Sequence, residues 1–155
     1  MGITTGSLVA TCCLLVSRAA AAERRYVGRT TLELDRLLAG ALDQDGLDTD
    51  RIASIQDLLL ATDGDTARKR RAAEALSELV ERANDDYLVR QWAARDLALY
   101  PPPSNLERLA LVLTNPSDDL NVRVNLLGAF ESWDKDGAAR ATATLTIDDP
   151  LRRYL

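Results

Sequence analysis

The sequence predicts an all-α domain of about seven to eight helices, stacked as antiparallel helical hairpins. Alanine and leucine dominate the 155 residues, only five prolines interrupt them, and aromatic residues make up 5%. Ala and Leu favour helices because they lose little side-chain freedom there. No run of Val, Ile, Thr and aromatic residues alternates with period two, as a half-buried strand requires. Finally, a short motif recurs after about 30 residues, a period that is typical of stacked helical hairpins.

Residues 1–28 form an apolar segment that has two interpretations. One is an amphipathic helix over residues 8–26. The other is a secretory signal cleaved near Ala20 or Ala22, although Arg18 interrupts the approach to that cleavage site. The apolar run is too short to span a bilayer. We therefore expect a cytoplasmic chain, with export as the alternative.

Residues 29–155 form the second unit, a domain of helical repeats. Apolar residues recur there at steps of three and four, which indicates helices with one buried face. In its first half, threonine or aspartate stands at the start of each apolar pattern and can cap the helix. Loops containing Gly46 and Gly64 separate the patterns. The expected helices cover residues 32–42, 50–61 and 65–83.

In the second half, three prolines at 101–103 end one helix and Pro116 ends the next. The helix between these prolines is apolar almost all round, so we expect it to be sandwiched between neighbours. Gly137 is expected in a loop, and the final residues start a helix that stays unfinished at Leu155. The expected helices cover residues 86–100, 104–114, 119–133 and 138–145, and from residue 50 onward they should pair in order of sequence.

The recurring motif is an acidic pair followed by an arginine. Its three copies read DDYLVR at residues 85–90, DDLNVR at 118–123 and DDPLRR at 148–153. When the first two copies are superimposed, Val89 meets Val122, and apolar positions continue to match along both helices. The same face of each helix should therefore be buried.

The pattern Asp-Asp-x-x-Val-Arg-x-x-Ala-Ala-x-x-Leu at residues 85–97 resembles the first helix of a HEAT-like repeat, in particular the short phycobilisome-lyase type. Residues 70–76 look like a weaker copy, and the resemblance covers about residues 50–155. It implies an armadillo-like α-solenoid in which an aspartate and an arginine tie each hairpin to the next. From the residues alone, an aspartate that starts a helix can cap it, and an arginine four residues later can reach that aspartate. The resemblance assigns four residues to this ladder between repeats: Asp86, Arg90, Asp119 and Arg123.

The chemistry of common active sites is missing from the sequence. There is no histidine, the two cysteines are adjacent, and the net charge is −5. Histidine is the commonest general base and metal ligand, and an acidic chain lacks the basic field that nucleic-acid binding requires. No phosphate loop, dinucleotide fingerprint or nucleophile elbow occurs, and the aspartate-rich loops lack the closing glutamate of a calcium loop. We therefore expect no catalytic residue, cofactor or metal.

The sequence thus favours a non-catalytic scaffold that binds another protein through one helical face, with neither nucleic acid nor membrane as partner. Repeat stacks present extended surfaces, usually lined by the second helix of each pair. Self-association through the incomplete C-terminal repeat is a further expectation. The alternative is a HEAT-like nucleic-acid-binding or DNA-glycosylase-like protein. The candidate partner-binding residues are polar residues expected to be exposed: Arg68, Lys69, Arg70, Glu74, Ser77, Glu107, Arg108 and Arg140.

Overall fold

The computed structural model describes residues 31–155, and all regular structure in this part of the chain is helical. The predicted all-α class is therefore confirmed for these residues. The expectations for residues 1–28, a helix or a signal segment, lie outside the described residues. Residues 31–42 form the first described helix. It is followed by α2 (Asp48–Ala61), α3 (Thr66–Glu81), α4 (Tyr87–Leu97), α5 (Leu106–Thr114), α6 (Leu120–Trp133), α7 (Lys135–Thr142) and the 3-10 helix η1 (Pro150–Tyr154).

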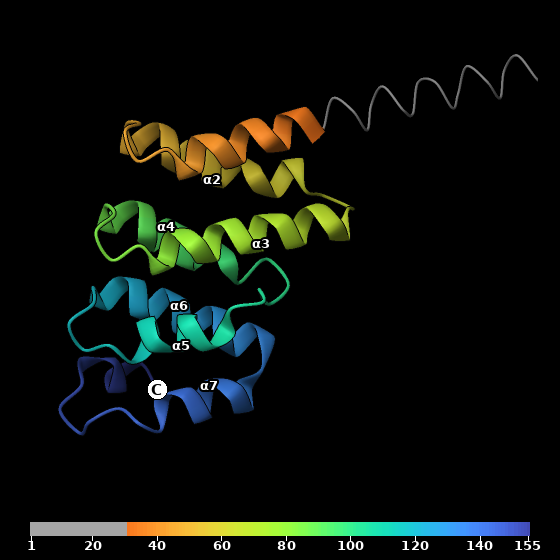
Figure 1. Ribbon diagram of the computed structural model, residues 1–155. Helices are drawn as coiled ribbons and strands as arrows, with labels where there is room; N and C mark the ends of the chain where they lie inside the picture. The colour runs from red at the N-terminus through yellow and green to blue at the C-terminus, as the bar shows by residue number, and fades with distance from the viewer. Residues whose placement is uncertain (1–30) are drawn as a thin grey trace, which may run out of the picture.

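The helices lie in two rows (Figure 1). In the first, which we call the A row, α2, α4, α6 and η1 each pack against the next; in the second, the B row, α3 packs against α5 and α5 against α7. The helix at residues 31–42 lies above α3 in Figure 1, where Arg71 contacts Asp35 and Arg82 donates to the Leu42 carbonyl. Pairing in order of sequence describes this only in part, because α3 packs more extensively on α4 than on α2.

The apolar faces of both rows meet in one core. Val89 and Val122, which the repeat superimposes, are both fully buried, and so is Leu97. Beyond these core positions, the Tyr100 carbonyl just after α4 accepts a hydrogen bond from the indole Nε1 of Trp133, the last residue of α6, over 2.8 Å. The expectation that matching positions of the two repeats face the core is therefore confirmed.

The helix α5 differs from its prediction. It was expected to be sandwiched, but only Leu109 and Leu113 are fully buried and Leu111 is 70% exposed. The reason is its place in the B row, where α3, α6 and α7 are its packing neighbours and one face stays open. Part of its apolar surface therefore remains available on the outside of the molecule.

The helix α7 begins earlier than predicted. The Asp134 side chain accepts a hydrogen bond from the Asp136 amide over 3.1 Å and caps the helix, which then starts at Lys135 instead of residue 138. Gly137 lies in the first turn of α7, so its predicted place in a loop is wrong. After α7, Asp149 caps η1, whose first residue is Pro150.

Candidate functional site

The most regular polar feature of the molecule is a set of three buried arginines on consecutive A-row helices. Arg51 on α2, Arg90 on α4 and Arg123 on α6 are only 2%, 4% and 1% exposed. Each one contacts a main-chain carbonyl ten residues earlier and an aspartate in the next layer. We call this set of contacts the arginine ladder.

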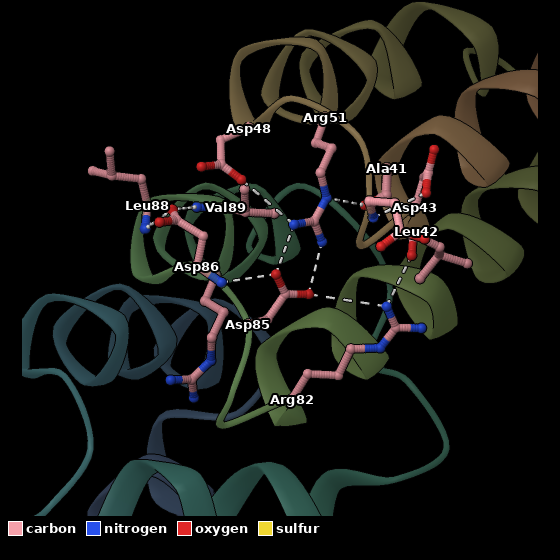
Figure 2. Close-up of polar contacts among 12 residues, drawn as sticks. Ala41, Leu42, Asp43, Asp48, Arg51, Arg82, Asp85, Asp86, Leu88 and Val89 are labelled. Atoms are coloured by element: carbon pink, nitrogen blue, oxygen red, sulfur yellow. Dashed lines mark hydrogen bonds and ion pairs between the residues drawn. The ribbon is translucent and has the colours of Figure 1, made fainter.

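Figure 2 shows the first rung, which joins α2 to the loop before α4. The Arg51 Nε donates to the Ala41 carbonyl over 3.3 Å, and its two terminal nitrogens donate to the two Asp85 carboxylate oxygens over 2.6 and 2.7 Å. Arg82 is a second cation, 3.9 Å from the same carboxylate. The hydrogen bond from Arg51 lowers the pKa of the Asp85 carboxyl and outweighs the opposing effect of burial. The same hydrogen bond raises the pKa of Arg51.

The second rung repeats this geometry one layer down. Two nitrogens of Arg90, Nε and Nη2, donate to the Val80 carbonyl over 3.1 and 2.8 Å. Its terminal nitrogens bind both oxygens of Asp118 over 2.7 and 2.8 Å. A planar guanidinium matches a carboxylate in this bidentate way, which fixes the relative orientation of the two groups.

The third rung ends the ladder. The Arg123 Nε donates to the Leu113 carbonyl over 2.8 Å, and its Nη2 donates to the Asp149 carboxylate over 2.6 Å. This last hydrogen bond lowers the pKa of Asp149, again against the effect of burial.

The carbonyl of the first rung lies near the C-terminal end of the helix at residues 31–42, and those of the other two rungs near the C-terminal ends of the B-row helices α3 and α5. Main-chain oxygens there lack partners inside the helix. The negative end of the helix dipole also favours a cation there. Each arginine therefore joins three pieces: its own A-row helix, the end of the helix that precedes it in the chain and the loop of the next layer. A buried ion pair adds little net stability over apolar residues, although losing one partner is costly. We infer that the ladder mainly fixes how successive layers are positioned.

The two aspartates of each acidic pair have different roles. The first, Asp85 or Asp118, binds the arginine of the layer above and also accepts from the amide of the next residue over 2.8 Å. The second, Asp86 or Asp119, caps the helix that follows by accepting from two main-chain amides. The predicted pairing of Asp86 with Arg90, within one helix, is therefore wrong.

The same correction applies to Asp119 and Arg123, which do not pair. Asp119 nevertheless contributes one contact between layers, because it accepts from the Gln91 Nε2 over 3.1 Å. Of the four predicted ladder residues, Arg90 and Arg123 are rungs, and Asp86 and Asp119 are caps.

In the third acidic pair one residue does both tasks. Asp149 binds Arg123 and also accepts from the Leu151 amide over 2.8 Å, whereas Asp148 is exposed. The third copy follows the second after 30 residues, whereas the second follows the first after 33. In addition, Pro150 has no amide hydrogen to donate to the aspartate before it. In the third copy the second aspartate of the pair therefore binds the arginine, whereas in the first two copies the first aspartate does so.

Sequence reasoning missed Arg51, because no acidic pair precedes it. Gly46 and Leu47 stand at the two places that aspartates occupy before Arg90. The available signal was the apolar pattern after it, since Ile55 and Leu58 follow Arg51 at the steps at which Ala94 and Leu97 follow Arg90. The weak copy proposed at residues 70–76 contains no rung.

The candidate partner-binding residues lie mostly on the B row. Arg68, Lys69 and Arg70 occupy the first turns of α3. Further along, Glu74 and Arg108 line a pocket of about 460 Å³ between α3 and α5. Here Glu74 accepts from the amide and hydroxyl of Ser104 over 2.8 and 2.9 Å, and Arg108 pairs with Glu81 over 2.5 Å.

The other three candidates are placed differently. Ser77 is buried and donates its hydroxyl to the Glu74 carbonyl over 2.7 Å, so its predicted exposure is wrong. Glu107 is exposed on α5, and Arg140 on α7 pairs with Asp134 over 3.1 Å.

Comparison of the chain with known protein families, with curated proteins and with solved structures finds no match. Within residues 31–155, no group of three or more acidic, histidine or cysteine residues is placed to hold a metal ion. In the same range, every helix is too short or too polar to cross a membrane. A functional proposal for this chain therefore depends on the ladder and on the surfaces that the two rows present.

Proposed function

We propose that this chain is a HEAT-like α-solenoid that acts as a non-catalytic scaffold and binds another protein. The observation that supports this most is the arginine ladder, which repeats one set of contacts in three successive layers. A protein built from one repeated contact behaves as a stack of similar units and presents an extended surface.

The partners of the ladder residues also favour a scaffold. The three arginines and their three aspartates are buried and neutralise one another, so these cations do not face a phosphate backbone. The chain as a whole has a net charge of −5. A nucleic-acid-binding protein instead presents clustered, exposed Lys and Arg, which makes a protein the better partner.

The surface that we assign to the partner is the outer face of α3 and α5. Arg70 and Arg108 are exposed there, Glu74 is half-buried, and Leu111 of α5 adds apolar area. Protein interfaces combine an apolar patch with arginine and a polar rim. The face therefore combines apolar, arginine and acidic side chains, as protein interfaces do.

The proposal is tested by affinity capture from an extract of the cells that produce the protein, with the full chain immobilised. Arg70→Glu/Arg108→Glu reverses two charges on the proposed face, and Asp57→Arg on the exposed side of α2 is the control. We expect a protein to be retained by the wild type and by the control, and lost by the double variant.

Two results would contradict the proposal. If the wild type retains no protein, the scaffold function is wrong. If the wild type, the control and the double variant all retain the same protein equally, the assigned face is wrong. Retention of duplex DNA on a filter at low salt, by contrast, would support the nucleic-acid alternative.

A further inference from the structure

The first turns of α3 carry a cluster of positive charge in an otherwise acidic chain. Arg68, Lys69, Arg70 and Arg71 are consecutive, whereas the chain as a whole has 24 acidic and 19 basic residues. We call these four residues the basic turn. Arg70 is exposed, the Arg71 side chain is 52% exposed, and Lys69 is half-buried.

The fold alone does not explain cations at this place. The N-terminus of a helix is the positive end of its dipole, where acidic side chains stabilise the helix and basic ones destabilise it. The first turn of α3 nevertheless contains no acidic residue, and only the capping residue Asp65 supplies negative charge there. A local rule that a sequence breaks without a compensating gain marks a place where a function is expected.

Contacts inside the fold account for only half of the basic turn. Arg68 lies 3.2 Å from a carboxylate oxygen of Asp65, and Arg71 donates to Asp35 over 2.7 Å. The other two side chains of the basic turn make no hydrogen bond or ion pair with any residue in the range 31–155. Two positive charges therefore remain for a ligand.

The basic turn is also accessible to a large ligand. The next B-row helix, α5, begins only at the level of Glu74, whose carboxylate accepts from the amide and hydroxyl of Ser104 over 2.8 and 2.9 Å. The first turns of α3 extend beyond this point (Figure 1). A segment of another protein can therefore reach the basic turn without displacing a helix.

We propose that the basic turn binds a short acidic segment, rich in Glu or Asp, of the protein partner. Opposite charge attracts such a segment, and the positive end of the α3 dipole adds to the attraction. The basic turn spans only about 6 Å along the helix axis, whereas a duplex-binding protein commonly contacts about 6–10 phosphates. A patch of this size in an acidic chain fits a few carboxylates better than a phosphate backbone. This inference rests on the scaffold function proposed above and states the chemistry of its partner.

Fluorescence anisotropy of a labelled deca-glutamate peptide, titrated at low salt with the purified full chain, tests the proposal. We expect saturable binding that weakens as salt is added, because the charges are exposed. Lys69→Glu/Arg70→Glu should raise Kd by about tenfold or more. Lys135→Glu/Arg153→Glu, which reverses an exposed lysine and an exposed arginine elsewhere, is the matched control. It changes the net charge by the same amount and should raise Kd by less than about threefold.

Thermal unfolding of the same variants separates binding from folding. Acidic residues in the first turns of α3 complement the helix dipole, so Lys69→Glu/Arg70→Glu should have the Tm of the wild type or a higher one. A loss of binding without a loss of stability then cannot result from misfolding.

The proposal is overturned if the wild type does not bind the peptide, or if the two double variants weaken binding equally. It is also overturned if the wild type binds duplex DNA more tightly than the peptide at the same salt and Lys69→Glu/Arg70→Glu abolishes this, since the basic turn would then serve nucleic acid. Because the peptide assay contains no other protein, it can fail while affinity capture succeeds, and the scaffold proposal then stands.

Discussion

Replacing Arg90 by methionine removes the central rung of the ladder and keeps much of the aliphatic side chain. The Val80 carbonyl loses both of its donors from Arg90, at 3.1 and 2.8 Å. The Asp118 carboxylate, only 6% exposed, loses a bidentate partner and keeps the Asp119 amide. A carboxylate left in the interior without its cation is strongly disfavoured.

The expected loss follows from this burial. Removing one partner of a buried ion pair destabilises a protein by about 3–5 kcal/mol. In a domain of this size each kcal/mol lowers Tm by about 2–4 °C, so Tm should fall by roughly 6–20 °C. The ion pair of Arg71 with Asp35 is the matched control: its distance is also 2.7 Å, but the two side chains are 52% and 49% exposed. Arg71→Met should cost at most about 1 kcal/mol.

Urea unfolding followed by far-ultraviolet circular dichroism measures both variants. A double-mutant cycle of Arg90→Met with Asp118→Asn should give a coupling free energy of about 0.5–3 kcal/mol, as residues in direct contact do. The reasoning is refuted if Arg90→Met destabilises no more than Arg71→Met, or if the effects of the two ladder substitutions simply add.

Three further predictions concern single sites. Because Arg51 lowers the folded-state pKa of Asp85, stability from this rung is present above the unfolded pKa of about 3.9 and is lost as pH falls through the folded value. Asp85→Asn should therefore make the urea midpoint depend less steeply on pH between about pH 5 and about pH 2. A pH dependence as steep as that of the wild type would contradict this. Asp86→Ala removes a helix cap and should cost about 1 kcal/mol by urea unfolding, well below the loss from a rung. Gly128→Ala in the exposed middle of α6 should stabilise by about 0.5–1 kcal/mol, since an added Cβ meets nothing within 4 Å. Gly137→Ala is its control and should give no gain in Tm, because the new Cβ would lie 2.7 Å from the capping carboxylate of α7.

Much of the fold could be predicted because it depends on local patterns. Apolar residues at steps of three and four located the helices up to α6, whereas the start of α7 was placed three residues too late. Superimposing the two clear copies of the motif identified Val89 and Val122 as core residues. The resemblance to HEAT-like repeats also named Arg90 and Arg123 as residues that tie one layer to the next, and both lie in the ladder.

The choice of partner for each arginine could not be predicted in the same way. Asp86 stands four residues before Arg90 and looks like its natural partner in a single helix. Asp118 is 28 residues away in the chain and becomes its partner only through packing between layers. Arg51 escaped notice for a related reason: its partner Asp85 is 34 residues further on and belongs to the next copy of the motif.

The exposure of α5 also depended on packing. A helix that is apolar on nearly all sides can lie at the centre of a bundle or at its edge, and its own sequence does not decide between them. Its place in the B row leaves Leu111 in solvent.

The spacing of the rungs has a consequence for how the chain tolerates change in length. From carbonyl to arginine the span is ten residues in all three rungs, whereas from arginine to aspartate it is 34, 28 and 26. The connection that leads into each arginine-bearing A-row helix therefore has a fixed length, whereas the part of the chain between an arginine and its aspartate varies in length. A peptide tag inserted at residues 101–103, between α4 and α5, should lower the free energy of unfolding only slightly, by the entropy of closing a longer loop. One extra residue between Val80 and Arg90 would detach a guanidinium from its carbonyl and disturb every layer below.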